Sequence, residues 1–536
     1  MSYPDPPNQP SWGAPPPPGG GQYQPPPGPG YAPAPTAPQR SNRGWMIPVA
    51  AGLGVVMMAG TVWASNSVVQ NVLVGAQPES VLPASSIAFA KLDLRPSGGQ
   101  LADYAQFVQR LPDTMREEID PEADPAEELV DSLIENSGYE GMTYEEDFAP
   151  WLGQRFGFAV WTPENEEAAD SSGTAAAIAI AAEDEDAAEQ ALSEMQSQSE
   201  DVAFDVRDDF AIVTDKAAVL SDLDAQIASG GTLDEQDTYT RDMESIGTDN
   251  IASAWMDLGE IAALAQEGSG SEYGGFEEYG GLNQTDPLDS LQSYGEVSGR
   301  MALGLRIRPE YLELRGDTLD VSVDGVSTAD YEVPEPGLQL MGDLPDDTMM
   351  AVSGSGLADL AGQAYQDNPE DFAEFEGLMT DLGLTMPDGL TSLLGKRTAV
   401  GITDLGGSLD QFFGGAASPP SMQFRAEGAD SGAVESAIAE MWRNSYTSPP
   451  GVSTEGSVTV ATSGTTGTGR LGDDPVFKQT MAGTETAHLG MYLDLRPFAE
   501  SGGESAPEQW GALGASVTFD ASTVSTLARW APNGGG

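Results

Sequence analysis

The first residue to test for chemistry is His488, the only histidine in the chain, because a Ser/His/Asp triad would have to use it. It stands in the apolar stretch AHLGMYLDL, which is typical of a strand, so we expect a structural or edge role for it. The run Ser353-Gly354-Ser355-Gly356 lacks the spacing of a nucleophile elbow, and the chain contains no cysteine. We therefore predict no catalytic residue.

Carboxylates are the next candidates. Asp320, Ser322 and Asp324 are spaced like the first ligands of a calcium loop. Tyr331, however, stands where such a loop needs a glutamate, and the alternating valines favour a strand and a turn. We predict no metal-binding residue and no cofactor-binding residue, and we expect no bound cofactor.

Three aspartates recur in the same context. Asp93, Asp257 and Asp494 each follow an apolar stretch and precede the start of a helical pattern. This context predicts helix N-caps, in which the carboxylate accepts otherwise unpaired backbone N–H groups. A paired set that acts as a hydrolase, which needs neither cysteine nor histidine, remains the alternative.

The charge balance limits the partners of the protein. The chain has 22 basic and 85 acidic residues, a formal net charge of −63. Such a surface repels nucleic acid, since binding requires Lys and Arg to neutralise phosphates, so we predict no nucleic-acid partner. Cationic partners or divalent ions would be attracted to the acidic surface. Without cysteines the fold must rely on core burial instead of disulfides.

The chain begins with a segment that should not fold. Residues 1–44 are rich in Pro and Gly and cannot bury enough apolar surface, so they predict a disordered cytoplasmic tail. Its proline runs could dock on a cytoplasmic polyproline-binding partner.

An uncharged stretch from Trp45 to Trp63 follows this tail. We predict a transmembrane helix at 45–65, with residues 45–63 in contact with the membrane lipid bilayer, and a juxtamembrane linker at 66–80. Arg40 and Arg43 precede the span, whereas Lys91 is the first basic residue after it. The positive-inside rule therefore predicts a single-pass protein of the cell membrane with a cytoplasmic N-terminus and an extracytoplasmic C-terminal domain.

The rest of the chain matches itself at a period of about 245 residues, which indicates an internal repeat. Four matches keep the same order: Leu82–Ser86 with Leu344–Thr348, Trp151–Arg155 with Leu393–Arg397, Ala187–Met195 with Ala433–Met441, and Ile251–Glu260 with Ala487–Pro497. We predict an extracytoplasmic repeat 1 at 81–332, a proline-rich hinge at 333–337 and a repeat 2 at 338–536.

Each repeat alternates short apolar strands with helical stretches, so the fold class is α+β. Short connections predict antiparallel-rich sheets with the helices on one face. A hairpin formed by Val297–Ile307 and Tyr311–Leu314 is expected to close the first repeat.

The sequence LPASSIAFAKLDLRPSGGQ at Leu82–Gln100 and the repeated LG-[QK]-R strand starts follow a proline-rich tail and a single span. In these features the chain resembles the actinobacterial membrane-anchored family known as domain of unknown function 3352. That family has no agreed activity, so the resemblance implies a topology and supplies no catalytic residues.

These observations predict a non-enzymatic protein of the cell envelope whose acidic, duplicated outer domain binds or senses a ligand or partner. The alternatives are an envelope hydrolase with paired carboxylates and a scaffold that recruits partners through its tail. Two glycine-rich loops, Glu267–Asp286 and Gly406–Pro420, are the expected interaction surfaces.

Overall fold

The computed structural model of the chain describes residues 77–93, 98–119, 127, 130, 142–170, 173–198, 202–267, 297–323, 325–327, 333–367, 369–407, 420–442, 449–464 and 466–533. The predicted tail at 1–44, the predicted transmembrane helix at 45–65 and most of the linker at 66–80 lie outside these residues. Within the described ranges, no helix combines the length and the apolar character needed to cross a membrane. The membrane anchor therefore stays a prediction.

One large antiparallel sheet organises the described part of the chain. In its first half the strands pair in the order β4-β5-β3-β2-β1-β6-β7-β8. Their bounds are β1 Ser86–Asp93, β2 Leu152–Trp161, β3 Ala175–Ala182, β4 Ala203–Arg207, β5 Phe210–Thr214, β6 Ala252–Asp257, β7 Val297–Arg308 and β8 Tyr311–Val323, to which the short β9 Val326–Ser327 is added.

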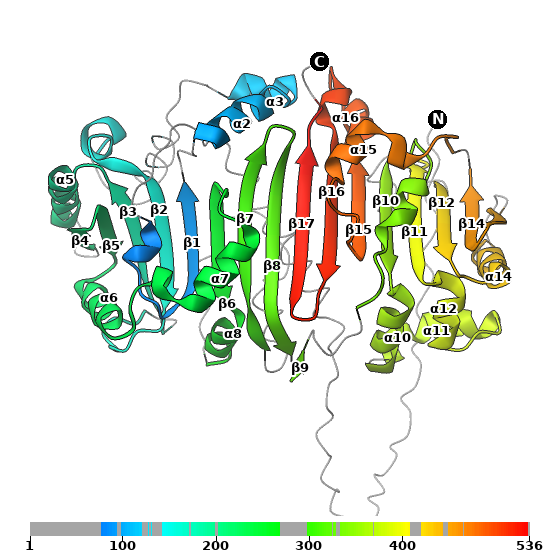
Figure 1. Ribbon diagram of the computed structural model, residues 1–536, viewed down its shortest axis with the longest axis horizontal. Helices are drawn as coiled ribbons and strands as arrows, with labels where there is room; N and C mark the ends of the chain where they lie inside the picture. The colour runs from blue at the N-terminus through cyan, green and yellow to red at the C-terminus, as the bar shows by residue number, and fades with distance from the viewer. Residues whose placement is uncertain are drawn as a thin grey trace, which may run out of the picture. The chain divides into compact units, whose positions relative to one another are not determined.

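The second half repeats this pairing in the order β13-β14-β12-β11-β10-β15-β16-β17. Its strands are β10 Met350–Ser355, β11 Arg397–Asp404, β12 Ser421–Glu427, β13 Gly451–Glu455, β14 Val458–Ser463, β15 Leu489–Asp494, β16 Ala512–Phe519 and β17 Thr523–Ala531. The halves join where β8 pairs with β17, and Figure 1 shows these two strands side by side.

Small details also recur between the halves. Pro83 forms an isolated bridge with Thr232, and Pro345 forms the matching bridge with Arg470. The same pairing order and the same bridges are what the predicted internal duplication requires. The predicted hairpin is confirmed as β7 and β8, but β8 does not close the first half, because it continues the sheet into the second.

Local capping explains where several helices begin. The side chain of Asp430 accepts the N–H of Ala433 at the start of α14 (Ser431–Met441). Asp474 accepts the N–H groups of Val476 and Phe477 at the start of α15 (Pro475–Thr480), where proline occupies the first turn. These contacts satisfy N–H groups that have no partner within the helix.

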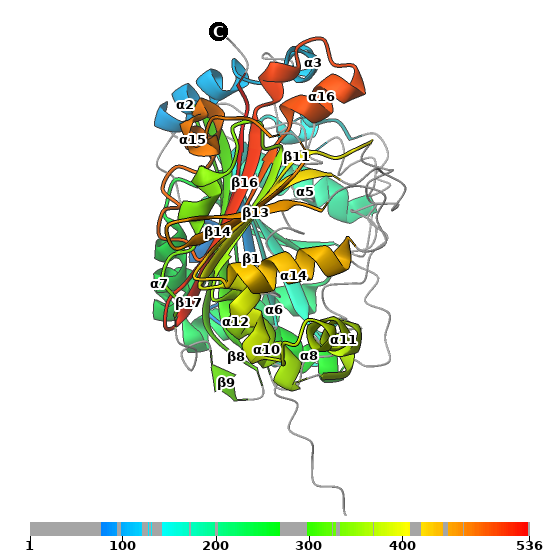
Figure 2. The same cartoon turned by 90° about the vertical axis from the view of Figure 1, so that its right-hand side faces the viewer.

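The prediction that helices cover one face is wrong, because they pack on both. The described helices are η1 Pro78–Ser80, α2 Gly98–Val108, α3 Asp113–Glu118, η2 Tyr144–Phe148, α5 Glu185–Gln198, α6 Ala217–Gly230, η3 Leu233–Glu235, α7 Asp237–Ile246, α8 Leu258–Glu267, η5 Leu338–Asp343, α10 Leu357–Asp367, η6 Pro369–Phe372, α11 Ala373–Asp381, α12 Asp388–Leu394, α14, η7 Leu471–Asp473, α15, α16 Arg496–Gly502 and η8 Pro507–Trp510. Figure 2 shows α7 and α15 on one side of the sheet and α5 and α14 on the other.

The two largest hydrophobic cores lie between the sheet and the helices on the side of α7 and α15. Phe89, Trp161 and Trp255 are buried there against residues of α6, α7 and η3. The equivalent core of the second half contains Tyr492 under η5, η7 and α15. Burial of large aromatic side chains contributes strongly to stability, so this layer fixes the sheet in both halves.

Candidate functional site

His488 has a structural role. It is buried directly before β15, where the N–H of Phe519 donates a hydrogen bond to its Nδ1 at 3.0 Å. Burial lowers the pKa of His488, and a hydrogen bond with the backbone of Pro334 partly opposes this shift. The hydroxyl of Ser353 has the carbonyls of Gly337 and Thr398 as acceptors for its one proton, and not the imidazole. These residues do not form a triad.

The three recurring aspartates do not converge on one place. Asp93 and Asp257 end two antiparallel neighbours, β1 and β6, so they lie at opposite ends of that strand pair. Asp494 ends β15 in the other half of the sheet. Asp257 accepts the N–H groups of Gly259 and Glu260 at the start of α8, which confirms the N-cap prediction for this residue.

The remaining two aspartates pair with arginine. Asp494 accepts the backbone N–H of Arg496 at 3.0 Å and also forms an ion pair with its guanidinium at 2.7 Å. Asp93 forms an ion pair with Arg155 at 3.4 Å. Both pairings indicate a structural role, so the described residues give no support to a hydrolase built from these three carboxylates.

The calcium-like stretch is part of the sheet. Asp320 belongs to β8 and has a left-handed backbone conformation with φ of 51°, in a bulge of the β7–β8 ladder. Its carboxylate forms an ion pair with Arg300 at 2.7 Å. No group of three or more metal-ligating side chains occurs in the part of the chain that the structure describes.

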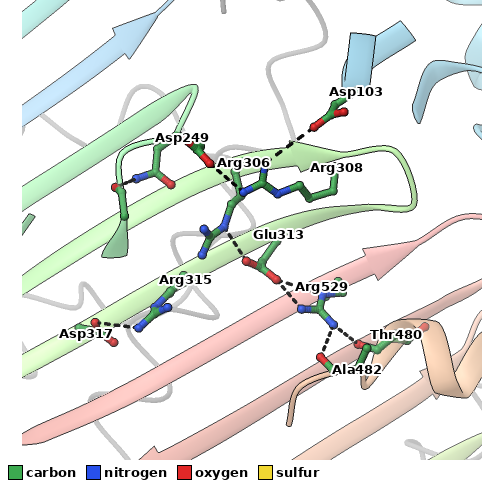
Figure 3. A network of polar contacts seen from close by, with 12 residues as sticks. Asp103, Asp249, Arg306, Arg308, Glu313, Arg315, Asp317, Thr480, Ala482 and Arg529 are labelled. Atoms are coloured by element: carbon green, nitrogen blue, oxygen red, sulfur yellow. Dashed lines mark hydrogen bonds and ion pairs between the residues drawn. The ribbon is translucent and has the colours of Figure 1, made fainter. Parts of the chain in front are cut away.

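A buried ion network crosses the junction of the two halves, and Figure 3 shows it from close by. Glu313 on β8 lies between Arg306 on β7 and Arg529 on β17 and forms ion pairs with them at 2.6 and 2.5 Å. Arg529 also donates to the carbonyls of Thr480, the last residue of α15, and of Ala482 just beyond it. Because each of these ions has an opposite charge beside it, the network can hold the halves in register without leaving an unpaired buried ion.

The two faces of the sheet differ sharply in charge. Away from the bulges at Asp320 and Asp404, the strand register places every charged strand side chain on one face, which we call the charged face. Its members are Lys91, Asp93, Arg155, Asp205, Arg207, Asp257, Arg300, Arg306, Arg308, Glu313, Arg315, Asp317, Arg397, Arg425, Glu427, Glu455, Asp494 and Arg529.

The opposite face, which we call the apolar face, consists in the same register, away from the bulge of β2 at Gln154, of Ala, Gly, Ser, Thr, Met, Val, Leu, Ile, Phe and Trp. Three helices cover parts of the apolar face, and each forms a separate hydrophobic core with the strands beneath it. Residues of α5 pack on the apolar face of β1 to β5, residues of α8 on that of β7 and β8, and residues of α14 on that of β12 to β14.

Between these helices, large apolar side chains of the strands reach the surface. In the first half Phe158 and Ile178 are opposite each other on β2 and β3 and are 39% and 38% exposed. In the second half Val352 and Met491 are opposite each other on β10 and β15 and are 56% and 44% exposed. A soluble surface rarely gathers such side chains without a function for them.

These side chains belong to two equivalent lines of neighbours, one in each half. We define the first apolar row as Ile178, Phe158, Ala90 and Ala254, which are consecutive cross-strand partners on β3, β2, β1 and β6. The second apolar row is formed in the same way by Phe424, Val400, Val352 and Met491 on β12, β11, β10 and β15. Each member is exposed or half-buried.

The equivalence of the rows follows from the sequence matches as well as from the pairing. The alignment of Leu82 with Leu344 places Ala90 against Val352, and the alignment of Asp257 with Asp494 places Ala254 against Met491. Different residues thus occupy equivalent positions, yet none of them is polar.

Sequence reasoning missed the apolar rows. The stretch AAAIAIAA of β3 has apolar residues on both faces, which is typical of a strand that is buried on both sides. The aligned strand positions of the two repeats, such as Ala90 with Val352 and Ala254 with Met491, are apolar in both, but the sequence does not show that they are exposed. The predicted interaction loops lie largely outside the described residues, since only Glu267 of the first and 406, 407 and 420 of the second are described.

The comparisons with known proteins bear on the first part of the chain. The model of a family described as "Protein of unknown function (DUF3352)" matches residues 47–219. This segment resembles that family. The match to the DUF3352 family extends from the predicted span to the first turn of α6 and assigns no activity. No curated protein matches the chain in sequence.

Two solved structures are similar to the chain at 8% and 9% sequence identity, and they are described as "Structure of crystal form III of TP0453" and "Structure of crystal form I of TP0453". The first covers 46% of this chain and 80% of its own, with a TM-score of 0.23. The second covers 46% and 79%, with a TM-score of 0.22. Scores this low do not define a shared fold.

Proposed function

We propose that this chain is a non-enzymatic binding protein of the cell envelope and that the two apolar rows are its binding surface. One observation carries the proposal: equivalent strand positions of both halves expose apolar side chains on a charge-free face. Exposed apolar area is unfavourable in water, and a ligand that covers it recovers the hydrophobic free energy.

The contrast with the rest of the chain strengthens this reading. The protein has a formal net charge of −63, and its described strands direct their charged side chains to the other face. A surface that only had to be soluble would use some of these charges on both faces. The envelope location rests on the predicted span at 45–65 and on Arg40 and Arg43 before it, and it is part of the proposal.

Site-specific cross-linking in the producing cells tests the binding surface. Phe158 in the full chain is replaced by the photoreactive p-benzoylphenylalanine, and Phe375 on α11, a phenylalanine of similar exposure at 36%, is replaced in the same way as the control. We expect illumination to give an adduct of defined mass at position 158 and none at position 375. Equal labelling at both positions, or none at either, contradicts the proposal.

A further inference from the structure

Taking the proposed binding function as its premise, we infer that the ligand of the apolar rows is the hydrocarbon chain of a lipid with an uncharged head group. The rows provide apolar contact along a line of side chains and offer almost no polar recognition. A hydrocarbon chain requires this kind of surface and nothing more.

The chemistry of the rows argues against a polypeptide ligand. Apart from the thioether of Met491, a weak acceptor, their side chains carry no hydrogen-bonding atom. The strands of Phe158 and Val352 are paired on both sides, so an extended peptide cannot add to them as a further strand. Any peptide polar group buried against the rows would lose its hydration without a partner, which is costly.

The dimensions of the rows fit a single chain. Each row crosses four neighbouring strands, and with a spacing of ~4.8 Å per step the outer strands are about 14 Å apart. The first row is bordered by Leu92, Phe156 and Ile180, which pack beneath α5, and Phe424 of the second row packs beneath α14. Each surface is therefore a strip with a helix beside it, which suits a linear ligand.

Charge determines the head group and disfavours a second copy of the protein. With a formal net charge of −63, the protein repels an anionic head group, such as a carboxylate or a phosphate monoester, that lies beside the rows. Two copies of the protein that paired through their apolar faces would repel each other, because both carry this negative charge. An uncharged head group avoids both penalties.

A photoreactive lipid provides the test. The probe is a monoacylglycerol whose acyl chain carries a diazirine, added to the purified full chain, and the labelled peptides are identified by mass spectrometry. We expect saturable labelling of the peptides that contain Phe158 and Ile178 and of those that contain Val352 and Met491. Unlabelled monoacylglycerol should compete.

Paired variants make the result specific to each row. In Phe158→Asn/Ile178→Asn we expect labelling of the first row to fall about tenfold or more, because two large apolar contacts are lost, while the second row remains labelled. Val352→Asn/Met491→Asn should give the reciprocal result. The unchanged row in each variant reports that the protein is folded. Val333→Asn, at an apolar residue outside the sheet that is 41% exposed, is the matched control and should leave both rows labelled.

The outcomes separate this inference from the proposed function. Labelling that neither pair of variants reduces, or that falls equally with Val333→Asn, overturns the lipid assignment. If the rows take up no lipid while position 158 forms a protein adduct in cells, the binding surface stands and its ligand is an apolar polypeptide. If neither experiment gives an adduct, both the lipid assignment and the proposed function are wrong.

Discussion

His488 offers a clean test at the scale of one residue, because the chain has no other histidine. Its pKa is lowered by burial, so the folded state holds the neutral imidazole. As the pH falls below about 6.5, the unfolded chain binds the proton first, and the free energy of unfolding decreases until the folded pKa is passed. We expect His488→Asn, which keeps an acceptor for the N–H of Phe519, to weaken this pH dependence.

The measurement is urea denaturation of both proteins between about pH 7 and about pH 5, above the ordinary range of most carboxylates. The two proteins are compared by the slope of the free energy of unfolding against pH and not by its absolute value, since the substitution also removes the ring contact between His488 and Phe519. Identical slopes would show that the imidazole does not contribute to the pH dependence.

The sequence also predicted individual roles well at this scale. The apolar context of His488 indicated a structural or edge role, and Asp257 is the predicted N-cap, because both predictions depend on neighbours only a few residues away. The exposure of Phe158 and Val352 could not be predicted in this way. Whether an apolar strand residue is covered depends on where helices from distant segments lie.

At the scale of elements, the buried network of Glu313 makes the strand junction sensitive to substitution. In Glu313→Gln, Arg306 and Arg529 lose their shared carboxylate, and Arg529 is itself buried. Leaving buried charge uncompensated costs on the order of 3–5 kcal/mol in the free energy of unfolding. Urea denaturation followed by tryptophan fluorescence measures this loss.

The matched control removes a charge from an exposed pair of the same region. Asp249 is 57% exposed and pairs with Arg308 at 3.0 Å, so Asp249→Asn should cost less than about 1 kcal/mol. If the two variants are equally stable, the network does not hold β8 against β17, and the junction depends on the backbone ladder alone.

Most strands were predictable because their apolar patterns are local. β3 and β5 have the predicted bounds, Ala175–Ala182 and Phe210–Thr214. The helices α6 and α7 were not predicted. The expectation of helices on one face was drawn from the short strand connections, which do not determine the face on which a helix packs. The pairing of β8 with β17 joins residues about two hundred positions apart, and local patterns carry no information on such a contact.

At the scale of the whole molecule, the predicted topology has a direct test. The positive-inside rule places the tail in the cytoplasm, so protease added to intact cells should remove the bulk of the protein. A tag placed before Tyr3 should stay protected. Detergent permeabilisation, which exposes the tag, is the control. A tag at the C-terminus that resists protease in intact cells would reverse the orientation and remove the envelope location from the proposal.

The last prediction concerns the acidic surface. Of the 22 basic and 85 acidic residues, only Arg40, Arg43 and Asp5 precede residue 66, which leaves 20 basic and 84 acidic residues for the remainder. The bases are already shared: Arg397 contacts both Glu335 and Glu427, and Arg300 contacts both Asp242 and Asp320. The surplus acids therefore repel one another in the folded state.

Salt should relieve this repulsion, because the Debye length falls from ~30 Å at 0.01 M to ~3 Å at 1 M ionic strength. We expect the melting temperature of the full chain to rise across this range, with divalent cations effective at lower concentrations than sodium. Replacing chloride by another monovalent anion at constant sodium controls for solvent effects that do not depend on charge. A melting temperature that stays flat or falls would mean that the shared arginines and solvation already balance the acids locally. The stability of this fold would then not depend on a cation-rich exterior.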